Sequence, residues 1–127
     1  MKQAVVINVV GLTTQILANE DLFIAQWSKT QGRTVATINP ILPAVTCSMQ
    51  TTYLTGVLPA AHGIVGNGWY NHDLAEVQFW KQSNHLVQAP SIWETARQLN
   101  PEFSCANMFW WYNMYSSVDY SLTPRPQ

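Results

Sequence analysis

The sequence predicts an α/β fold, with a mostly parallel sheet and helices on both faces. The first observation is the order of the elements, because strand-like runs alternate with helical patterns along the chain. The second is Ala4–Val10, a continuous β-branched run typical of a parallel strand that is covered on both faces. The third is composition: 47% of the 127 residues are hydrophobic and 10% are charged, against about 25% charged residues in an average soluble domain. Such a chain is expected to build a core rather than to remain disordered.

The first third of the chain is expected to continue with two helices and a second strand. Gly11 ends the first strand, and a short helix is predicted over Thr13–Ala18. Asn19 is a favourable capping residue for a second helical stretch, which Gly32 ends. The run Arg33–Asn39 predicts the second strand.

The rest of the chain gives stronger local signals. A helix over Thr46–Thr55 follows a turn shaped by two prolines and ends at Gly56. Pro90 stands where a helix begins, over Ser91–Leu99. The remaining expected segments are a glycine-rich loop, a hairpin, a third strand, an aromatic loop or short helix, and an irregular tail: Leu58–Gly68, Trp69–Trp80, Phe103–Phe109, Trp110–Tyr120 and Leu122–Gln127.

Three parallel strands make a small sheet for this many large apolar residues. We therefore expect residues 1–127 to be the N-terminal portion of a single larger domain, so that the fold is incomplete in this chain. An unfinished sheet edge and exposed aromatic rings would favour self-association of the isolated piece.

Composition also excludes several classes of protein. Six Lys and Arg against seven Asp and Glu leave a net charge of −1 without a basic stripe, which argues against binding to duplex nucleic acid. The apolar N-terminal run is shorter than the roughly 20 residues of a membrane span and lacks the pattern of a secretory signal. A chain that begins directly with its first strand is expected to be cytoplasmic. Cys47 and Cys105 form neither a disulfide framework nor a CxxC pair.

Thr46 is the first candidate for chemistry. It follows a strand and a turn and opens a helix, where free backbone N–H groups and the helix dipole favour an anion. A threonine in this place can attack a phosphoryl group if a metal lowers the pKa of its hydroxyl. The simpler alternative is that Thr46 only caps the helix. Cys47 is a rival nucleophile at the same helix start.

Two further groups of residues are weaker candidates. His62, His72 and His85 match no compact zinc pattern, and His62 is expected to shape the glycine-rich loop. The aromatic segment Phe109–Tyr115 follows a strand end, where open α/β sheets bind ligands. Its residues Trp110, Trp111 and Tyr112 either hold a flat group of a substrate by stacking or belong to the core or a covered surface.

Several stretches, in order and over nearly the whole chain, resemble the type I phosphodiesterase/nucleotide pyrophosphatase family of the alkaline phosphatase superfamily. Val5–Leu12 is similar to the family's first strand, and Leu42–Gly56 to its nucleophile segment with a later Thr-Gly. The most specific match is Leu58–Asn67, which is close to the family's Pro-x-x-His-Gly-Ile-x-Gly-Asn loop. Phe79-Trp80 and Pro90–Trp93 also fall where the family has similar residues.

The resemblance implies an alkaline-phosphatase-like domain with a central sheet. It implies a hydrolase that acts on small phosphoesters or nucleotide-like substrates through two divalent metals, usually zinc. Thr46 would be the nucleophile that forms a phosphothreonine intermediate, and its oxygen would touch one metal. The backbone N–H of Cys47 would help to hold the transferred group's oxygen.

Three departures from the family pattern stand out. Val10 replaces the metal-binding Asp at the end of the first strand, and the nearby Asn8 is a poor substitute. Met49 replaces the family's Asn three residues after the nucleophile, where Gln50 is a possible amide donor instead. The remaining metal ligands of the family lie beyond this chain, so we expect the chain alone to be inactive and to bind no metal.

Two functions therefore stand side by side. The first is a metal-dependent phosphodiesterase-like hydrolase with Thr46 as its nucleophile. The second is a non-hydrolytic relative with a degenerate metal site, which acts as a binding or assembly module. A sulfatase is set aside, because Cys47–Thr51 lacks the Pro and Arg of that signature.

Overall fold

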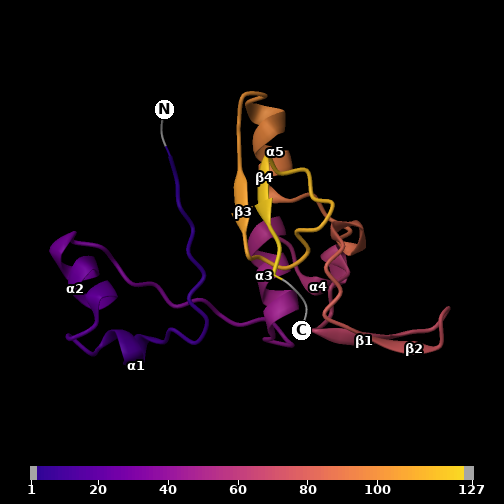
Figure 1. The fold of residues 1–127 in the computed structure, drawn as a ribbon. Coiled ribbons are helices and arrows are strands. Elements are labelled where there is room, and N and C mark those ends of the chain that lie inside the picture. Colours follow the sequence, from indigo (N-terminus) through magenta and orange to yellow (C-terminus); the bar gives the residue numbers. More distant parts are fainter. Residues whose placement is uncertain (1–2, 125–127) are drawn as a thin grey trace. The chain divides into compact units, whose positions relative to one another are not determined.

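The computed structural model describes residues 3–124. They form two compact units that divide between Asn39 and Pro40 (Figure 1). The elements are mixed α and β, with short helices and two two-stranded sheets. None of the described helices is long and apolar enough to cross a membrane.

The first unit holds two helices, both shorter than the sequence predicts. Helix α1 covers Thr14–Leu17, and the hydroxyl of Thr13 caps it by accepting from the N–H of Ile16 at 3.1 Å. Helix α2 covers Phe23–Thr30. The expected cap at Asn19 is wrong, because its Oδ1 accepts instead from the N–H of Asp21 in a local turn.

Residues 4–10 and 33–39 are not strands, which corrects two predictions. Both segments are exposed along their whole length, and neither pairs with another strand. The β-branched pattern indicates how a side chain packs in a sheet, but a strand also needs a neighbour for its backbone N–H and C=O groups. The predicted mostly parallel sheet is accordingly represented, among residues 3–124, by a single parallel pair.

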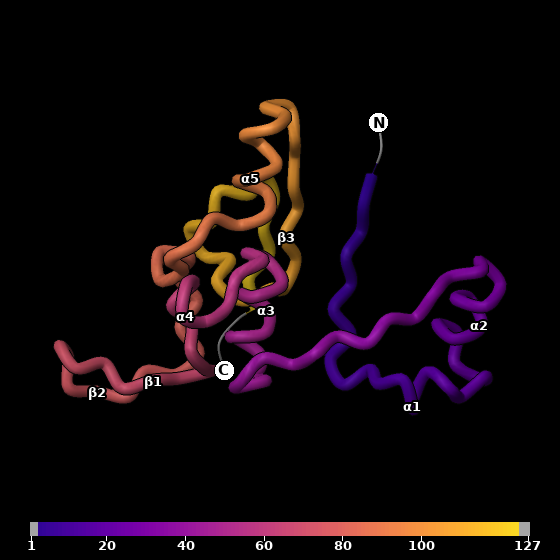
Figure 2. The backbone as a smooth tube through the Cα atoms, turned by 180° about the vertical axis from the view of Figure 1, so that it is seen from behind, coloured from indigo at the N-terminus to yellow at the C-terminus, as the bar shows by residue number. Residues whose placement is uncertain are grey.

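The second unit begins with helix α3, Thr46–Thr55, whose predicted bounds are confirmed. It ends at Gly56, which takes the left-handed conformation (φ 73°) that terminates many helices. The predicted loop that follows contains one helical turn, α4, over Pro59–His62. The predicted hairpin is confirmed as strands β1, Gly68–Asn71, and β2, Glu76–Phe79, and in both Figure 1 and Figure 2 it extends away from α3.

The C-terminal part of this unit contains a short 3₁₀ turn, η1, a helix and a parallel strand pair. The turn covers Asn84–Leu86, and helix α5 covers Ile92–Leu99 with a capping box between Ser91 and Glu94. Strand β3, Ala106–Met108, confirms the third predicted strand in shortened form.

The predicted tail is partly corrected. Strand β4, Tyr120–Leu122, pairs in parallel with β3, so the expected irregular segment begins with a paired residue. Residues 125–127 of the predicted tail lie outside the described residues. The segment between the two strands is a loop rather than a helix.

The core of the second unit lies beside α3. Cys47, Ile64 and Tyr112 are buried together, and Leu86, Val87 and Trp111 pack against them. Trp93 on α5 is also buried, and its indole N–H donates to the hydroxyl of Ser117 at 3.2 Å. These contacts join α3, the loop after α4 and the aromatic loop into one packed body.

Candidate active site

Thr46 is the first residue of α3, as the sequence predicts. The N-cap is Val45, which has extended backbone and makes no side-chain capping bond, so Thr46 is not a capping residue. Its side chain is half-buried. Because α3 starts here, the positive end of the helix dipole and the first backbone N–H groups lie at the same end of the helix as Thr46, an arrangement that favours an anion such as a phosphoryl group.

Asn67 lies against this helix start, and sequence reasoning did not assign it a role. Its Oδ1 accepts from the backbone N–H of Cys47 at 2.9 Å, across 20 residues of sequence. The amide orientation follows from this bond, since Cys47 N–H can only donate. The Nδ2 of Asn67 is therefore a donor beside the helix start. The signal was present in the sequence, since Asn67 ends the glycine-rich loop that matches the family.

The Cys47 N–H, expected to hold a substrate oxygen, thus has a protein acceptor. For it to bind a phosphoryl oxygen, the Asn67 amide must share the donor or turn aside. Burial raises the pKa of the Cys47 thiol above its ordinary value, and the side chain is 0% exposed. A buried, protonated thiol is a poor nucleophile, so Thr46 is the better candidate of the two.

Gln50 connects α3 to the aromatic loop. It lies one turn after Thr46 and is 8% exposed, and its Oε1 accepts from the backbone N–H of Trp111 at 2.9 Å. This bond fixes the carbonyl end of the amide. The Nε2 end remains as the donor that the sequence led us to expect.

The ring of Trp111 also packs against that of Trp80. The two ring centroids are 4.9 Å apart and the rings are tilted by 32°, and the backbone N–H of Trp80 donates to the backbone carbonyl of Asn67 at 2.9 Å. A closed circuit of contacts therefore runs from α3 through Asn67, Trp80 and Trp111 back to Gln50. It brings one of the three aromatic candidates, Trp111, into contact with α3.

The other two aromatic candidates lie differently. Tyr112 packs in the core at 2% exposure, and burial raises the pKa of its hydroxyl strongly. That hydroxyl lies beside the buried Cys47 thiol, which also raises its pKa. Trp110 is half-buried. Tyr112 and Trp80 both have positive φ, at 57° and 52°, a strained backbone conformation that is often found at functional sites.

The three histidines do not come together. His62 is fully buried: its Nδ1 accepts from the N–H of Ile64 at 3.1 Å, and its Nε2 lies 3.0 Å from the hydroxyl of Thr52. This bonding fixes the glycine-rich loop on α3, in agreement with the expected structural role. His72 lies in the hairpin turn and His85 in η1.

The described residues do not fit the two metals that the family usually binds. Residues 3–124 contain no group of three or more His, Cys, Asp or Glu side chains that could hold an ion. Val10, at the position of the family's Asp, has no ligand atom and is 77% exposed.

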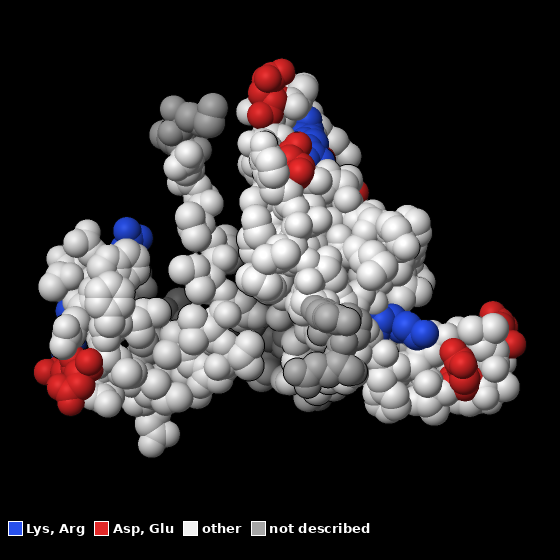
Figure 3. All heavy atoms as spheres, in the orientation of Figure 1, with Lys and Arg blue, Asp and Glu red and all other residues white. Residues whose placement is uncertain are grey.

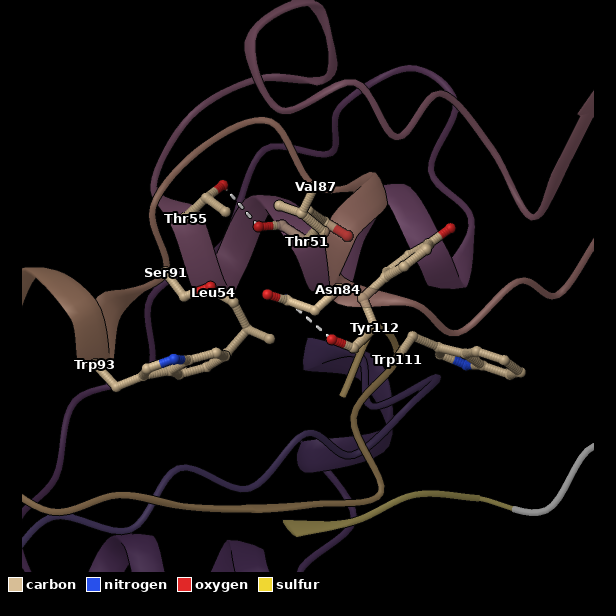
Figure 4. A pocket seen from close by; sticks show the side chains of 9 residues that line it. All are labelled: Thr51, Leu54, Thr55, Asn84, Val87, Ser91, Trp93, Trp111 and Tyr112. Carbon is tan, nitrogen blue, oxygen red and sulfur yellow. Dashed lines mark hydrogen bonds between the residues drawn. The ribbon is translucent and has the colours of Figure 1, made fainter. Parts of the chain in front are cut away.

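A small cavity lies between α3 and the aromatic loop (Figure 4). Its volume of about 10 Å³ suits one water molecule rather than a substrate. The lining side chains are Thr51, Leu54, Thr55, Asn84, Val87, Ser91, Trp93, Trp111 and Tyr112. Asn84 closes one side by donating from its Nδ2 to the carbonyl of Tyr112 at 3.0 Å.

Of three comparisons with known proteins, one found a match. Neither curated proteins nor solved structures show a match. A family model, type I phosphodiesterase / nucleotide pyrophosphatase, matches residues 4–127 and therefore nearly the entire sequence. Because the match covers almost all of the chain, including Thr46, Asn67 and the aromatic loop, the chain belongs to the type I phosphodiesterase/nucleotide pyrophosphatase family.

Proposed function

We propose that the protein is a phosphodiesterase or nucleotide pyrophosphatase that uses Thr46 as its nucleophile. One observation carries this proposal: Thr46 lies on the first turn of α3. The next residue, Cys47, donates its backbone N–H to the side-chain amide of Asn67. Family membership supports the reaction class, and small phosphoesters or nucleotides are the corresponding substrates.

In this proposal the Oγ of Thr46 attacks phosphorus, an Oγ–P bond forms, and the bond from phosphorus to the leaving oxygen breaks. The Nδ2 of Asn67, whose Oδ1 accepts from the Cys47 N–H, and the Nε2 of Gln50 are the side-chain donors that would stabilise charge on the transferred group's oxygens. Water then attacks the same phosphorus, the Oγ–P bond breaks, and the product is a phosphomonoester that keeps the second ester group of the substrate. Residues 3–124 contain no group of three or more His, Cys, Asp or Glu side chains that could hold the zinc-like ions implied by the family.

We also propose that residues 1–127 form the N-terminal portion of one larger alkaline-phosphatase-like domain. The unpaired segments 4–10 and 33–39 retain strand-like sequences, and β3 and β4 already form a parallel pair. The rest of the site would come from outside this chain.

A non-hydrolytic relative that serves as a binding or assembly module is the second candidate. Val10 and Met49, which stand where the family pattern has Asp and Asn, favour it. The two candidates differ in metal content, which can be measured by mass spectrometry on the full-length protein supplied with zinc. About two ions per chain would favour the hydrolase.

The decisive test is hydrolysis of a chromogenic phosphodiester by full-length protein carrying Thr46→Val or Thr46→Ser. Val keeps the shape of Thr and removes the hydroxyl, so we expect activity to disappear, whereas Ser should retain part of it. Thr95→Val is the matched control, because Thr95 is exposed on α5. Undiminished hydrolysis by Thr46→Val would exclude Thr46 as the nucleophile.

A further inference from the structure

Asn67 and Gly68 form the one Asn-Gly pair in the sequence. In such a pair the backbone nitrogen of the glycine can attack the side-chain carbonyl carbon of the asparagine, because glycine has no side chain that hinders the approach. Asn67 lies in the bend before β1, and Gly68 is the first residue of that strand. The hydrogen bond from Cys47 to Asn67 places this pair beside the start of α3.

The backbone nitrogen of Gly68 does not take part in the ladder between β1 and β2. The N–H of Trp80 donates to the carbonyl of Asn67 at 2.9 Å, which makes these two residues a hydrogen-bonded pair. Hydrogen-bonded and non-hydrogen-bonded pairs alternate along an antiparallel ladder, so Gly68 and Phe79 form a non-hydrogen-bonded pair. The N–H of Gly68 consequently points away from β2, and the sheet does not hold its nitrogen.

The side-chain carbonyl of Asn67 is held where negative charge on its oxygen is stabilised. Its Oδ1 accepts from the backbone N–H of Cys47, the second residue of α3, at 2.9 Å. This N–H is one of the donors that the first turn leaves without a partner inside the helix, at the positive end of the helix dipole. Such a donor polarises the carbonyl and stabilises the oxyanion that forms when a nitrogen attacks its carbon.

The fold also requires glycine at position 68. A Cβ on Gly68 would lie 2.8 Å from the backbone oxygen of Gln78 and closer still to the ring of Phe79. Any larger residue would force the backbone of β2 to move. The packing of the hairpin therefore maintains the reactive pair next to α3.

We propose that Asn67 is a site of spontaneous deamidation in the native protein. The nitrogen of Gly68 bonds to the Cγ of Asn67, and the Nδ2 leaves as ammonia with the proton that Gly68 gives up. The product is a cyclic imide. Water then opens either carbonyl of the ring, so position 67 becomes an aspartate or an isoaspartate and carries a negative charge. This reaction does not depend on the proposed hydrolysis.

The new charge falls in a stretch of sequence that has none. Residues 34–72 contain no Lys, Arg, Asp or Glu, and in Figure 3 the charged atoms of the second unit lie on or next to the hairpin and around α5. An aspartate at position 67 keeps an acceptor for the Cys47 N–H, but it loses the Nδ2 donor and repels a phosphoryl group at Thr46. Deamidation then acts as an age-dependent switch that lowers activity and leaves the fold intact, a consequence that rests on the proposed function.

The first test is peptide mapping by mass spectrometry of the folded 127-residue chain, incubated at mildly alkaline pH in water labelled with heavy oxygen. Asn71 is the matched control, because it is half-buried like Asn67. Its Oδ1 also accepts from a backbone N–H, that of Leu74 at 3.0 Å, but the next residue is His72. We expect Asn67 to take up the label at least about tenfold faster than Asn71. An Asn67 that stays intact, or that reacts no faster than Asn71, would overturn the proposal.

The variant His72→Gly separates the dipeptide from its setting. It gives Asn71 a following glycine, whereas the N–H on the Asn71 carbonyl belongs to a turn rather than to a helix. Asn67 should still react about tenfold faster in this variant, because only its carbonyl meets the first turn of α3. Equal rates at the two residues would show that the helix start contributes nothing, and the structural argument would be wrong.

The consequence for catalysis is tested separately, with Asn67→Asp in the full-length protein. We expect this variant to melt at or above the wild-type temperature and to hydrolyse the chromogenic phosphodiester about a hundredfold more slowly. Asn71→Asp makes the same exchange away from α3 and should leave hydrolysis unchanged. Wild-type activity of Asn67→Asp would overturn the switch. An inactive wild type, or activity retained by Thr46→Val, would refute the proposed function and leave the mass-spectrometric result standing.

Discussion

Replacing His62 with Gln should remove most of the pH dependence of stability between about pH 5 and 8. Both ring nitrogens of His62 are engaged, and the imidazole is fully buried. Because Nδ1 accepts from the Ile64 N–H, Nε2 carries the proton and donates to Thr52. A second proton on Nδ1 would lose the Ile64 bond and place a charge in the core.

Burial accordingly lowers the pKa of His62 below its ordinary value of 6.5. The unfolded chain binds the proton near that value, while the folded chain does not. Below about pH 6.5 the unfolded state therefore holds more protons, and the free energy of unfolding falls as the pH falls. For one proton the slope reaches at most about 1.4 kcal/mol per pH unit.

The assay is urea unfolding, followed by tryptophan fluorescence, at a series of pH values. His62→Gln should flatten the decline toward acid pH. Thr52→Val is the comparison variant: it removes the hydroxyl that accepts from Nε2 and leaves the imidazole buried. It should reduce stability by a similar amount at every pH and retain the slope. The reasoning is refuted if His62→Gln shows the same slope as wild type, or if wild type becomes more stable as the pH falls.

Two further pairs of substitutions, each a test variant and its comparison, probe the packing of the second unit by the same unfolding assay. Trp93→Ala should lower the free energy of unfolding by about 3–5 kcal/mol, because Trp93 is only 2% exposed. The control is Ile92→Ala: its side chain is 60% exposed, so this change should alter the free energy of unfolding by less than about 1 kcal/mol. Gly63→Ala should destabilise more than Gly56→Ala. Both glycines have positive φ, which costs Ala about 1–2 kcal/mol, but only at Gly63 would the new Cβ also meet a neighbour, at 2.9 Å from the side chain of Gln88. Equal effects at the two glycines would contradict the predicted steric contribution.

The parts of the fold that were predicted from sequence are those with local signals. Helix α3 starts after a proline-shaped turn and stops at Gly56, and Pro90 precedes the capping box of α5. Residues 4–10 and 33–39 have the composition of strands, but whether a strand forms depends on a distant partner that composition does not specify. The parallel partner of β3 was missed for the same reason.

The candidate site likewise contains features that local sequence predicts and features that depend on distant residues. Thr46 was identified from its neighbours in sequence, and its place on the first turn of α3 is confirmed. The bond from Cys47 to Asn67 and the packing of Trp80 against Trp111 join segments 20 or more residues apart. The left-handed backbone at Trp80 was not predictable either, since bulky residues rarely adopt it.

Because Cys47 is buried, the rate at which a thiol reagent modifies it reports local opening of the structure around it. The thiol is 0% exposed and directly follows Thr46, whereas Cys105, the other free cysteine, is half-buried just before β3. A thiol reagent can modify Cys47 only during openings that lift the start of α3 from the core. The labelling rate of native protein therefore measures how often the start of α3 opens, and Cys105 provides the reference rate for a more accessible thiol. Loss of the Asn67 amide should accelerate labelling of Cys47 and leave that of Cys105 unchanged.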